Sequence, residues 1–471
     1  MVRRAGKRHP DPVAKEVNDM EQTKENKMGT MPVNRLLITM SLPMMISMLV
    51  QALYNVVDSI FVSRINENAL TAVSLAFPIQ TLMIAVAGGT CVGINAVLSR
   101  ALGEKEQERA DNAASSGVLL MGISYLLFLA LGLFGTRAFY LSQTDDVQIV
   151  TYGVAYLSVV CCCSFGLFSQ FVFERLLQST GRTFYIMITQ GTGAIINIIL
   201  DPIFIFGLCG MPKMGVMGAA VATVTGQIVA GTIAFVINSR KNEDIHISAK
   251  KLRLEREVVG QIYKIGVPSM IMQAIGSVMT YGMNLILISF TPTATAVFGV
   301  YFKLQSFIFM PVFGMNNGLV PILAYNYGAG RRDRFIQALK CGIFYAVGIM
   351  AVGVVVFQSI PQILLGFFEA SPEMLAIGVP ALRIISICFV MAGFSIICGT
   401  AFQALGNAVY SMIVSIARQL IVLLPAAYLL SLAGNVDFVW WSFPIAELVS
   451  LVVTVFFLIR INREVIRHIG E

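Results

Sequence analysis

A carboxylate and a proline occur together inside a long apolar stretch of the sequence, Asn197-Ile-Ile-Leu-Asp-Pro-Ile-Phe-Ile-Phe206. Asn197 and Asp201 are four residues apart, so in a helix their side chains share one face. Pro202 has no amide hydrogen and leaves the carbonyl group of Ile198 without its helical partner. Because a charged side chain in a bilayer costs about 2.5 kcal/mol or more, Asp201 indicates a functional site.

Two further polar residues are predicted to lie at the depth of Asp201. Asp58 lies in the first apolar stretch and Thr223 in the sixth, and the first and fifth stretches would cross the membrane in the same direction. Two carboxylates that lie together away from water favour the uptake of a proton or another cation. We therefore predict a cation-coupling site at Asp58, Asn197, Asp201 and Thr223, with the first three as the ligands if the ion is sodium. The alternative is that these groups only satisfy one another and specify helix packing.

The composition excludes an ordinary soluble domain. Hydrophobic residues make up 56% of the chain and charged residues 13%, whereas soluble domains carry about 25% charged residues. The eight cysteines have no C-x-x-C spacing, and the three histidines lie outside the apolar stretches. Disulfides, a metal centre and haem are therefore not expected, and no cofactor is predicted beyond a proton or sodium as the coupling ion.

Apolar stretches long enough to cross a membrane as helices recur along the chain, and we count twelve. They cover residues 35–62, 69–99, 113–135, 147–172, 184–209, 215–238, 260–290, 294–326, 336–360, 373–402, 409–432 and 437–460. Basic residues concentrate in alternate loops, which by the positive-inside rule places both termini in the cytoplasm. The sequence therefore predicts an all-α, multi-pass protein of the plasma membrane.

The second half of the sequence repeats the first at an offset of 225 residues. The offset pairs Pro43 with Pro268, Gly89 with Gly314, Gly93 with Gly318, Gly103 with Gly328, Arg109 with Arg334 and Gly181 with Gly406. Six spans separate each pair, so the repeat predicts two six-helix lobes related by a pseudo-twofold axis along the membrane normal. The G-x-x-x-G spacings at 89–93 and 314–318 allow close helix packing. We interpret them as packing within each lobe and predict a monomer.

The repeat divides the chain into five segments. We expect an N-terminal lobe at 35–238, a cytoplasmic linker at 239–257 and a C-terminal lobe at 258–462. Residues 1–34 mix charges of both signs with few apolar residues, which predicts a disordered cytoplasmic tail. Residues 463–471 are expected to form a second cytoplasmic tail.

Polar residues within the apolar stretches are candidates for the lining of a substrate cavity. They are Gln51, Tyr54, Asn55, Gln170, Tyr281, Asn284, Asn316 and Asn317, together with Lys303 and Arg418 as charged residues of the second lobe. Pairing of Arg418 with Glu447 is an equally good interpretation of that arginine. Pro43 and Pro202 are candidate hinges, because prolines bend helices.

Several segments together resemble the multidrug and toxic compound extrusion (MATE) family of the MOP superfamily. They are Asn55-Val-Val-Asp-Ser-Ile-Phe-Val-Ser, Ala72-Val-Ser-Leu-Ala-Phe-Pro-Ile, Gly93-Ile-Asn-Ala-Val-Leu-Ser-Arg-Ala-Leu-Gly103, Leu177-Gln-Ser-Thr-Gly181, residues 197–206 and Phe402-Gln-Ala-Leu-Gly406. The resemblance implies two lobes that form a V around a central cavity. It also implies export of mostly cationic, amphipathic drugs in exchange for protons or sodium ions.

The resemblance carries the family's cation site onto Asp58, Asn197, Asp201 and Thr223. Within the seventh span, the segment 277–284 lacks the acidic residue that one branch of the family uses for sodium, so the chain resembles the MepA-like branch.

We therefore predict a secondary active multidrug efflux transporter and not an enzyme, with small organic compounds and membrane lipids as partners and no role for nucleic acid. A lipid-linked precursor flippase of the same superfamily is the alternative, and it would be expected to line its cavity with cationic residues. An intramembrane enzyme has little support, since H-E-x-x-H, G-x-S-x-G and P-loop patterns are absent. A channel is a third alternative, which accumulation of substrate against a gradient would exclude.

Overall fold

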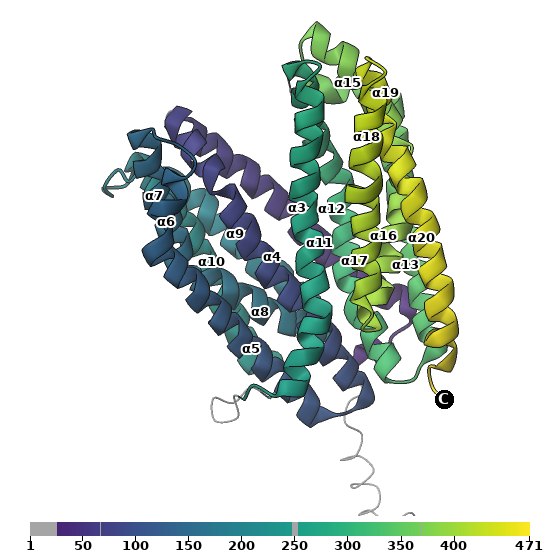
Figure 1. Cartoon of the computed structure of the whole chain (residues 1–471). Coiled ribbons are helices and arrows are strands. Elements are labelled where there is room, and N and C mark those ends of the chain that lie inside the picture. The colour runs from purple at the N-terminus through teal and green to yellow at the C-terminus, as the bar shows by residue number, and fades with distance from the viewer. Residues whose placement is uncertain (1–25, 66, 247–252, 369) are drawn as a thin grey trace, which may run out of the picture.

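The protein is helical throughout the part of the chain that the structure describes. The structure is a computed structural model, and it describes residues 26–65, 67–246, 253–368 and 370–471 (Figure 1). Ten helical segments are long and apolar enough to cross a membrane, and two bent pairs of helices bring the total to twelve. For these residues, the prediction of an all-α protein with twelve spans is confirmed.

The first half of the chain supplies six spans. Its helices are α2 (Lys27–Thr30), α3 (Val33–Ser63), α4 (Glu67–Glu104), α5 (Gln107–Ala130), α6 (Thr136–Leu141), α7 (Val147–Cys162), α8 (Phe165–Ser179), α9 (Thr183–Phe206) and α10 (Val216–Lys241). A π-helical turn at Leu131–Gly135 joins α5 to α6 as one span. Helix α9 stops at Phe206 because Gly207 adopts the left-handed conformation, with φ 75°.

The second half supplies the other six spans. Its helices are α11 (Arg256–Ile288), α12 (Pro292–Gly328), α13 (Arg332–Ser359), α14 (Pro361–Gly366), α15 (Pro372–Ser386), α16 (Phe389–Ala404), α17 (Ala408–Ile416), α18 (Leu424–Ser431), α19 (Val436–Trp440) and α20 (Ser442–Glu464). A π-helical segment at Ala417–Leu423 joins α17 to α18, and a short turn at Ile466–His468 follows α20.

The fourth and tenth spans are broken at equivalent places in the repeat. Helices α7 and α8 meet at a bend of 41°, and α15 and α16 meet at a bend of 48°. The first break contains Cys163 and the second contains Cys388, which the 225-residue offset pairs. The repeat therefore extends from the sequence to the shape of individual spans.

The helices form two lobes that converge at one end and separate at the other (Figure 1). We call the end where they converge the closed end. It contains the last turns of α4 and α12, and the chain's C-terminus lies on the same side of the molecule.

The glycines of the two G-x-x-x-G spacings pack against a helix from the opposite half of the chain, so the prediction that they pack within each lobe, as bounded by the sequence, is wrong. A Cβ on Gly93 would lie 2.1 Å from the carbonyl oxygen of Ile262 on α11, and one on Gly318 would lie 2.8 Å from Cα of Ser41 on α3. The sequence motif indicates a close helix contact, but it does not say which helix is the partner.

Helices α3 and α11 each contribute to the cores of both lobes. The first turns of α3, with Leu37 and Met40, pack in the core formed mainly by residues of the second half, whereas Val62 near its end packs in the other core. Helix α11 does the reverse, with Ile262 in the first core and Met283 in the second. The lobe boundaries predicted at 35–238 and 258–462 divide the sequence into halves. In the packed molecule, the beginnings of α3 and α11 each lie in the core formed mainly by the opposite half.

The residues immediately before α3 are ordered, which corrects the predicted disordered tail at 1–34. Asn26 caps α2 by accepting a hydrogen bond from the Met28 amide, and the Met28 side chain is fully buried. The tail has few apolar residues, but Met28 is enough to anchor this part of it in a core. Residues 1–25 lie outside the described residues, as do residues 247–252 of the predicted linker. At the other terminus, Gly470 packs against Gly330.

Candidate functional site

Helices α3 and α9 pack against each other and bring the two intramembrane aspartates into contact. The carboxyl groups of Asp58 and Asp201 lie within hydrogen-bonding reach of each other. Asp201 is fully buried, and Oδ1 of Asp58 has no hydrogen-bond partner among the described residues. Two carboxylates in contact repel each other unless a proton or another cation lies between them.

Asn197 and Thr223 complete this polar cluster. In the orientation of the Asn197 amide that satisfies both neighbours, its NH2 group donates to Asp201 Oδ2 at 3.2 Å. Its oxygen then accepts hydrogen bonds from Thr223 Oγ1 and from the Thr223 amide, both at 3.1 Å. Helices α9 and α10 come this close because Gly193 faces Gly226, where a Cβ would lie 2.6 Å from the Gly193 carbonyl oxygen. The structure thus brings together the four residues assigned to cation coupling.

The chemistry of the cluster suits a proton or a hard cation. Its carboxylate, amide and hydroxyl oxygens are ligands for ions such as sodium, and it offers no thiolate or imidazole for a transition metal. In the described part of the chain, no group of three or more His, Cys, Asp or Glu side chains could hold a metal ion.

The two candidate hinge prolines lie inside continuous helices. Pro202 lies in the last turns of α9, and Pro43 lies in α3, where Ser47 Oγ donates to its carbonyl oxygen at 2.9 Å. In α3, Pro43 falls between Met40, in the core of the second lobe, and Met44, which packs against Leu177. The hinge role of both prolines stays a prediction.

A cavity of about 480 Å³ lies beside the cluster and shares its side chains. Asn197, Thr223 and Tyr54 line this cavity, so a change in the cluster alters the cavity wall directly. Other predicted residues that line it are Gln51, Gln170, Asn316 and Asn317. The rest of the wall mixes apolar and polar side chains and includes Met44, Met48, Ile84, Phe171, Gln190, Gln227, Gln273 and Phe313.

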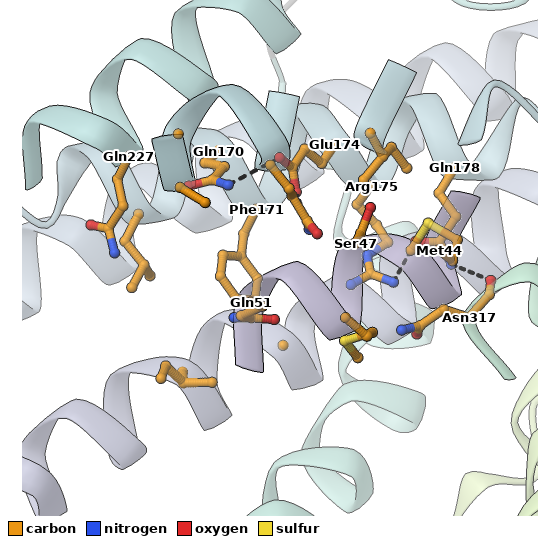
Figure 2. Close-up of a pocket in the computed structure, with 18 of the residues that line it drawn as sticks. Met44, Ser47, Gln51, Gln170, Phe171, Glu174, Arg175, Gln178, Gln227 and Asn317 are labelled. Carbon is orange, nitrogen blue, oxygen red and sulfur yellow. Dashed lines mark hydrogen bonds between the residues drawn. The ribbon is translucent and has the colours of Figure 1, made fainter. Parts of the chain in front are cut away.

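Glu174 is a cavity residue that the sequence analysis missed. Only 6% of it is exposed, and its carboxylate accepts hydrogen bonds from Gln170 Nε2 at 3.0 Å, Thr189 Oγ1 at 2.8 Å and Gln190 Nε2 at 2.8 Å. Figure 2 shows the bond from Gln170 beside the cavity. The fourth span was predicted to end at residue 172, which put Glu174 in a loop, but α8 continues to Ser179. The spacing of Gln170 and Glu174, one helical turn apart, could have identified it.

Arg175 and Gln178 connect the cavity to the other lobe. Arg175 Nη1 donates to Gln178 Oε1 at 2.6 Å, and Gln178 Nε2 donates to the carbonyl oxygen of Asn317 on α12 (Figure 2). Among the described residues, the cavity wall therefore carries one carboxylate and one guanidinium group, with a hydrogen-bonded link between α8 and α12 at its edge.

Four other residues assigned to the cavity, Tyr281, Asn284, Lys303 and Arg418, do not line it. Arg418 forms an ion pair with Glu447 at 3.2 Å inside the second lobe, and Lys303 lies 5.9 Å from the centre of the Phe368 ring. Tyr281 is 67% exposed on α11, and Asn284 is partly buried one turn further along that helix. The cavity lies mainly against α3, α8, α9 and α10, so most second-lobe side chains are too distant to reach it. The side chain of Asn55 lies outside what the structure describes.

Comparison with known proteins gives consistent matches over most of the chain. The family model MatE matches residues 43–203 and again residues 268–429. The multidrug export protein MepA of Staphylococcus haemolyticus is 27% identical over 417 residues, which cover 88% of this chain and 91% of the relative. An FAD transporter of Shewanella oneidensis is 26% identical over 426 residues, covering 88% and 92%.

Solved structures of transporters are similar to this chain over nearly its whole length. A multidrug resistance MATE family transporter of the MOP superfamily in an outward-facing conformation superimposes with a TM-score of 0.88 at 26% identity, covering 94% of this chain and 98% of that one. A MOP superfamily transporter from Pyrococcus furiosus, described as having a binding pocket of reverse polarity, superimposes with a TM-score of 0.85 at 26% identity, covering 94% and 99%.

Proposed function

The chain belongs to the MatE family, and on this premise we propose that it exports amphipathic organic cations in exchange for protons or sodium ions. The observation that carries the proposal is the sharing of Asn197 and Thr223 between the carboxylate cluster and the cavity. An antiporter needs its ion site and its substrate site to influence each other, and shared side chains provide that link.

Cation uptake at the carboxylates alters the cavity through Asn197. When Asp58 and Asp201 take up a cation, Asp201 becomes a poorer acceptor for the Asn197 amide, and the Asn197–Thr223 wall repacks. Because α3 carries Asp58 and also enters the core of the second lobe, a change in its outer half reaches both lobes. The bound substrate is released as the cavity wall changes.

The cavity favours a substrate with an apolar body and a positive charge. Met44, Met48 and Phe313 provide adaptable apolar contacts. The Glu174 carboxylate provides the negative charge, held in place by three hydrogen bonds. The similarity to MepA of Staphylococcus haemolyticus, a multidrug export protein, supports drugs as the substrates.

Arg175 favours a second candidate substrate class, an anionic nucleotide. Its guanidinium group lines the same cavity, and one similar protein is an FAD transporter. A flippase for a lipid-linked pyrophosphate is less well supported, since Arg175 is the one cationic side chain among the described residues that line the cavity.

The positive-inside rule supports a cytoplasmic position for the closed end of the V, because the loops that carry most basic residues lie there. The described conformation then opens outward, which agrees with the similarity to an outward-facing MATE transporter.

Transport by purified protein in liposomes tests these proposals. We expect ethidium, a cationic dye, to be exchanged for protons or sodium when either gradient is imposed, and we expect Asp201→Asn to abolish this exchange. Asp145→Asn, which alters an exposed aspartate in the loop before α7, serves as the matched control and should transport normally. Exchange of FAD but not ethidium would select the second candidate, and gradient-driven exchange by Asp201→Asn would refute the coupling site.

A further inference from the structure

The residues just before α3 form a short segment that touches both lobes at the closed end. We call residues 26–31 the N-terminal strap. On one side, Asn26 Nδ2 donates to the carbonyl oxygen of Thr180 and to Asp244 Oδ1, both at 3.1 Å. Thr180 follows α8 and Asp244 follows α10, so this end of the strap is bound to the first lobe.

The other side of the strap is bound to the second lobe. The carbonyl oxygen of Met28 accepts hydrogen bonds from Arg334 Nη2 at 3.0 Å and from Asn326 Nδ2 at 3.2 Å. Arg334 Nη2 also donates to the Met31 carbonyl oxygen at 2.7 Å. The Met28 side chain is fully buried in the same core as Phe335 of α13. Charged donors and a buried side chain make this attachment the stronger of the two.

The strap sits tightly on the first lobe as well. Gly181 adopts a left-handed φ of 83°, and a Cβ at this position would lie 3.0 Å from Cε of Lys27 and 3.5 Å from Cγ of Met28. Burial lowers the pKa of the Lys27 ammonium group, and the neighbouring Arg182 guanidinium lowers it further. The turn between α8 and α9 thus packs closely against the strap.

The repeat has a related contact at the start of α11. Ser116 Oγ on α5 donates to the carbonyl oxygen of Arg253 at 3.2 Å, and Arg109, the repeat partner of Arg334, donates to Gln261 on α11 at 2.8 Å. Each helix that crosses between the lobes is therefore held near its beginning by the opposite half of the chain.

We propose that the N-terminal strap is a latch that holds the closed end shut and releases one lobe before the protein opens on that side. The proposal rests on the alternating access that the proposed function implies. If the closed end opens, Thr180 and Asp244 move away from Arg334, and the strap cannot stay bound to both. Because Met28 anchors the strap to the second lobe, the bonds of Asn26 are the ones that break.

The substitution Asn26→Asp tests the latch without removing the cap of α2. An aspartate keeps the acceptor that caps α2, but it loses the donor to Thr180 and places a carboxylate against Asp244. Loss of two hydrogen bonds, one to a charged acceptor, should raise the opening equilibrium of the closed end by at least about thirtyfold. The double variant Asn26→Asp with Asp244→Asn restores a donor and an acceptor between the two positions and should reverse much of the effect.

Hydrogen–deuterium exchange of the full-length protein measures this opening without any substrate. We expect the amides of the buried residues 96–99 of α4 and 322–326 of α12 to exchange at least about thirtyfold faster in Asn26→Asp. Asn68→Ala removes a side-chain hydrogen bond to Gln148 in the first lobe, away from the strap, and should leave these amides unchanged. Faster exchange confined to residues 26–31, or equal acceleration in Asn68→Ala, would overturn the proposal. Failure of ethidium transport would not affect this measurement.

Discussion

Gly103 allows the ends of α4 and α12 to cross at the closed end, and we expect Gly103→Ala to force them apart. A Cβ at this position would lie 2.1 Å from the carbonyl oxygen of Tyr325 and 2.9 Å from the amide nitrogen of Ala329. Both are backbone atoms, so no side chain can turn aside to make room. Reaching an ordinary contact of 3.4 Å requires the helices to separate by about 1.3 Å.

Overpacking of this kind costs about 1–3 kcal/mol, which weakens the closed arrangement by a factor of about 5 to 150. Thermal unfolding of the purified protein in detergent should therefore occur at a lower temperature in Gly103→Ala. Outward ethidium export should also slow, because the closed end no longer seals.

Gly260→Ala is the matched control for this substitution. Gly260 is also a helical glycine near the closed end, but a Cβ there would meet nothing within 4 Å. Alanine is favoured over glycine in a helix by up to about 1 kcal/mol, so this control should be neutral or stabilising. If Gly103→Ala unfolds and transports like Gly260→Ala, the close crossing of α4 and α12 is incorrect.

Three further substitutions test other parts of the structure. Asp201→Asn should keep the thermal unfolding midpoint but lose gradient-driven ethidium export, because a neutral amide can neither carry a transferable proton nor supply the negative charge that holds a sodium ion. Normal export would contradict the cluster's role. Glu174→Gln should weaken ethidium binding by about tenfold, as expected for losing one charged contact, and fluorescence titration of the dye measures this affinity. Binding of a neutral compound is the control and should not change. An equal loss of affinity for both compounds would show that the effect is only structural. Arg418→Met leaves the buried Glu447 carboxylate without its partner, so it should destabilise the protein by about 3–5 kcal/mol. Adding Glu447→Leu should restore much of the thermal stability, and failure to do so would show that the ion pair is not what the single variant disrupts.

Features that depend on one helix or on the chain's own periodicity follow from the sequence alone. The length and apolarity of the spans, the shared face of Asn197 and Asp201, and the two-lobe repeat all depend on local spacing. The pairing of Asp58 with Asp201 follows from their depth, because spans that cross in the same direction place equivalent positions at one level. These are properties that a sequence carries without reference to partners.

The exact ends of helices are harder to predict from the sequence, and two predictions were wrong for that reason. The fourth span extends past residue 172, which brings Glu174 into the cavity, and residues 26–31 of the predicted tail are held in place by the burial of Met28. In both cases, polar residues made the sequence look like a loop or a tail, although tertiary contacts stabilise the segment. The Glu174 carboxylate accepts three hydrogen bonds and the Met28 carbonyl oxygen accepts two.

Only the tertiary structure decided which elements face one another. A glycine motif specifies that some backbone comes close, yet only the structure shows that Gly93 contacts α11 and Gly318 contacts α3, each from the opposite half of the chain. It also selects Gln51, Tyr54 and Gln170 for the cavity and places Arg418 against Glu447 instead. The physical reason is that helical periodicity fixes the directions of side chains relative to their own axis, whereas their neighbours depend on how separate axes pack, which is set by the whole fold.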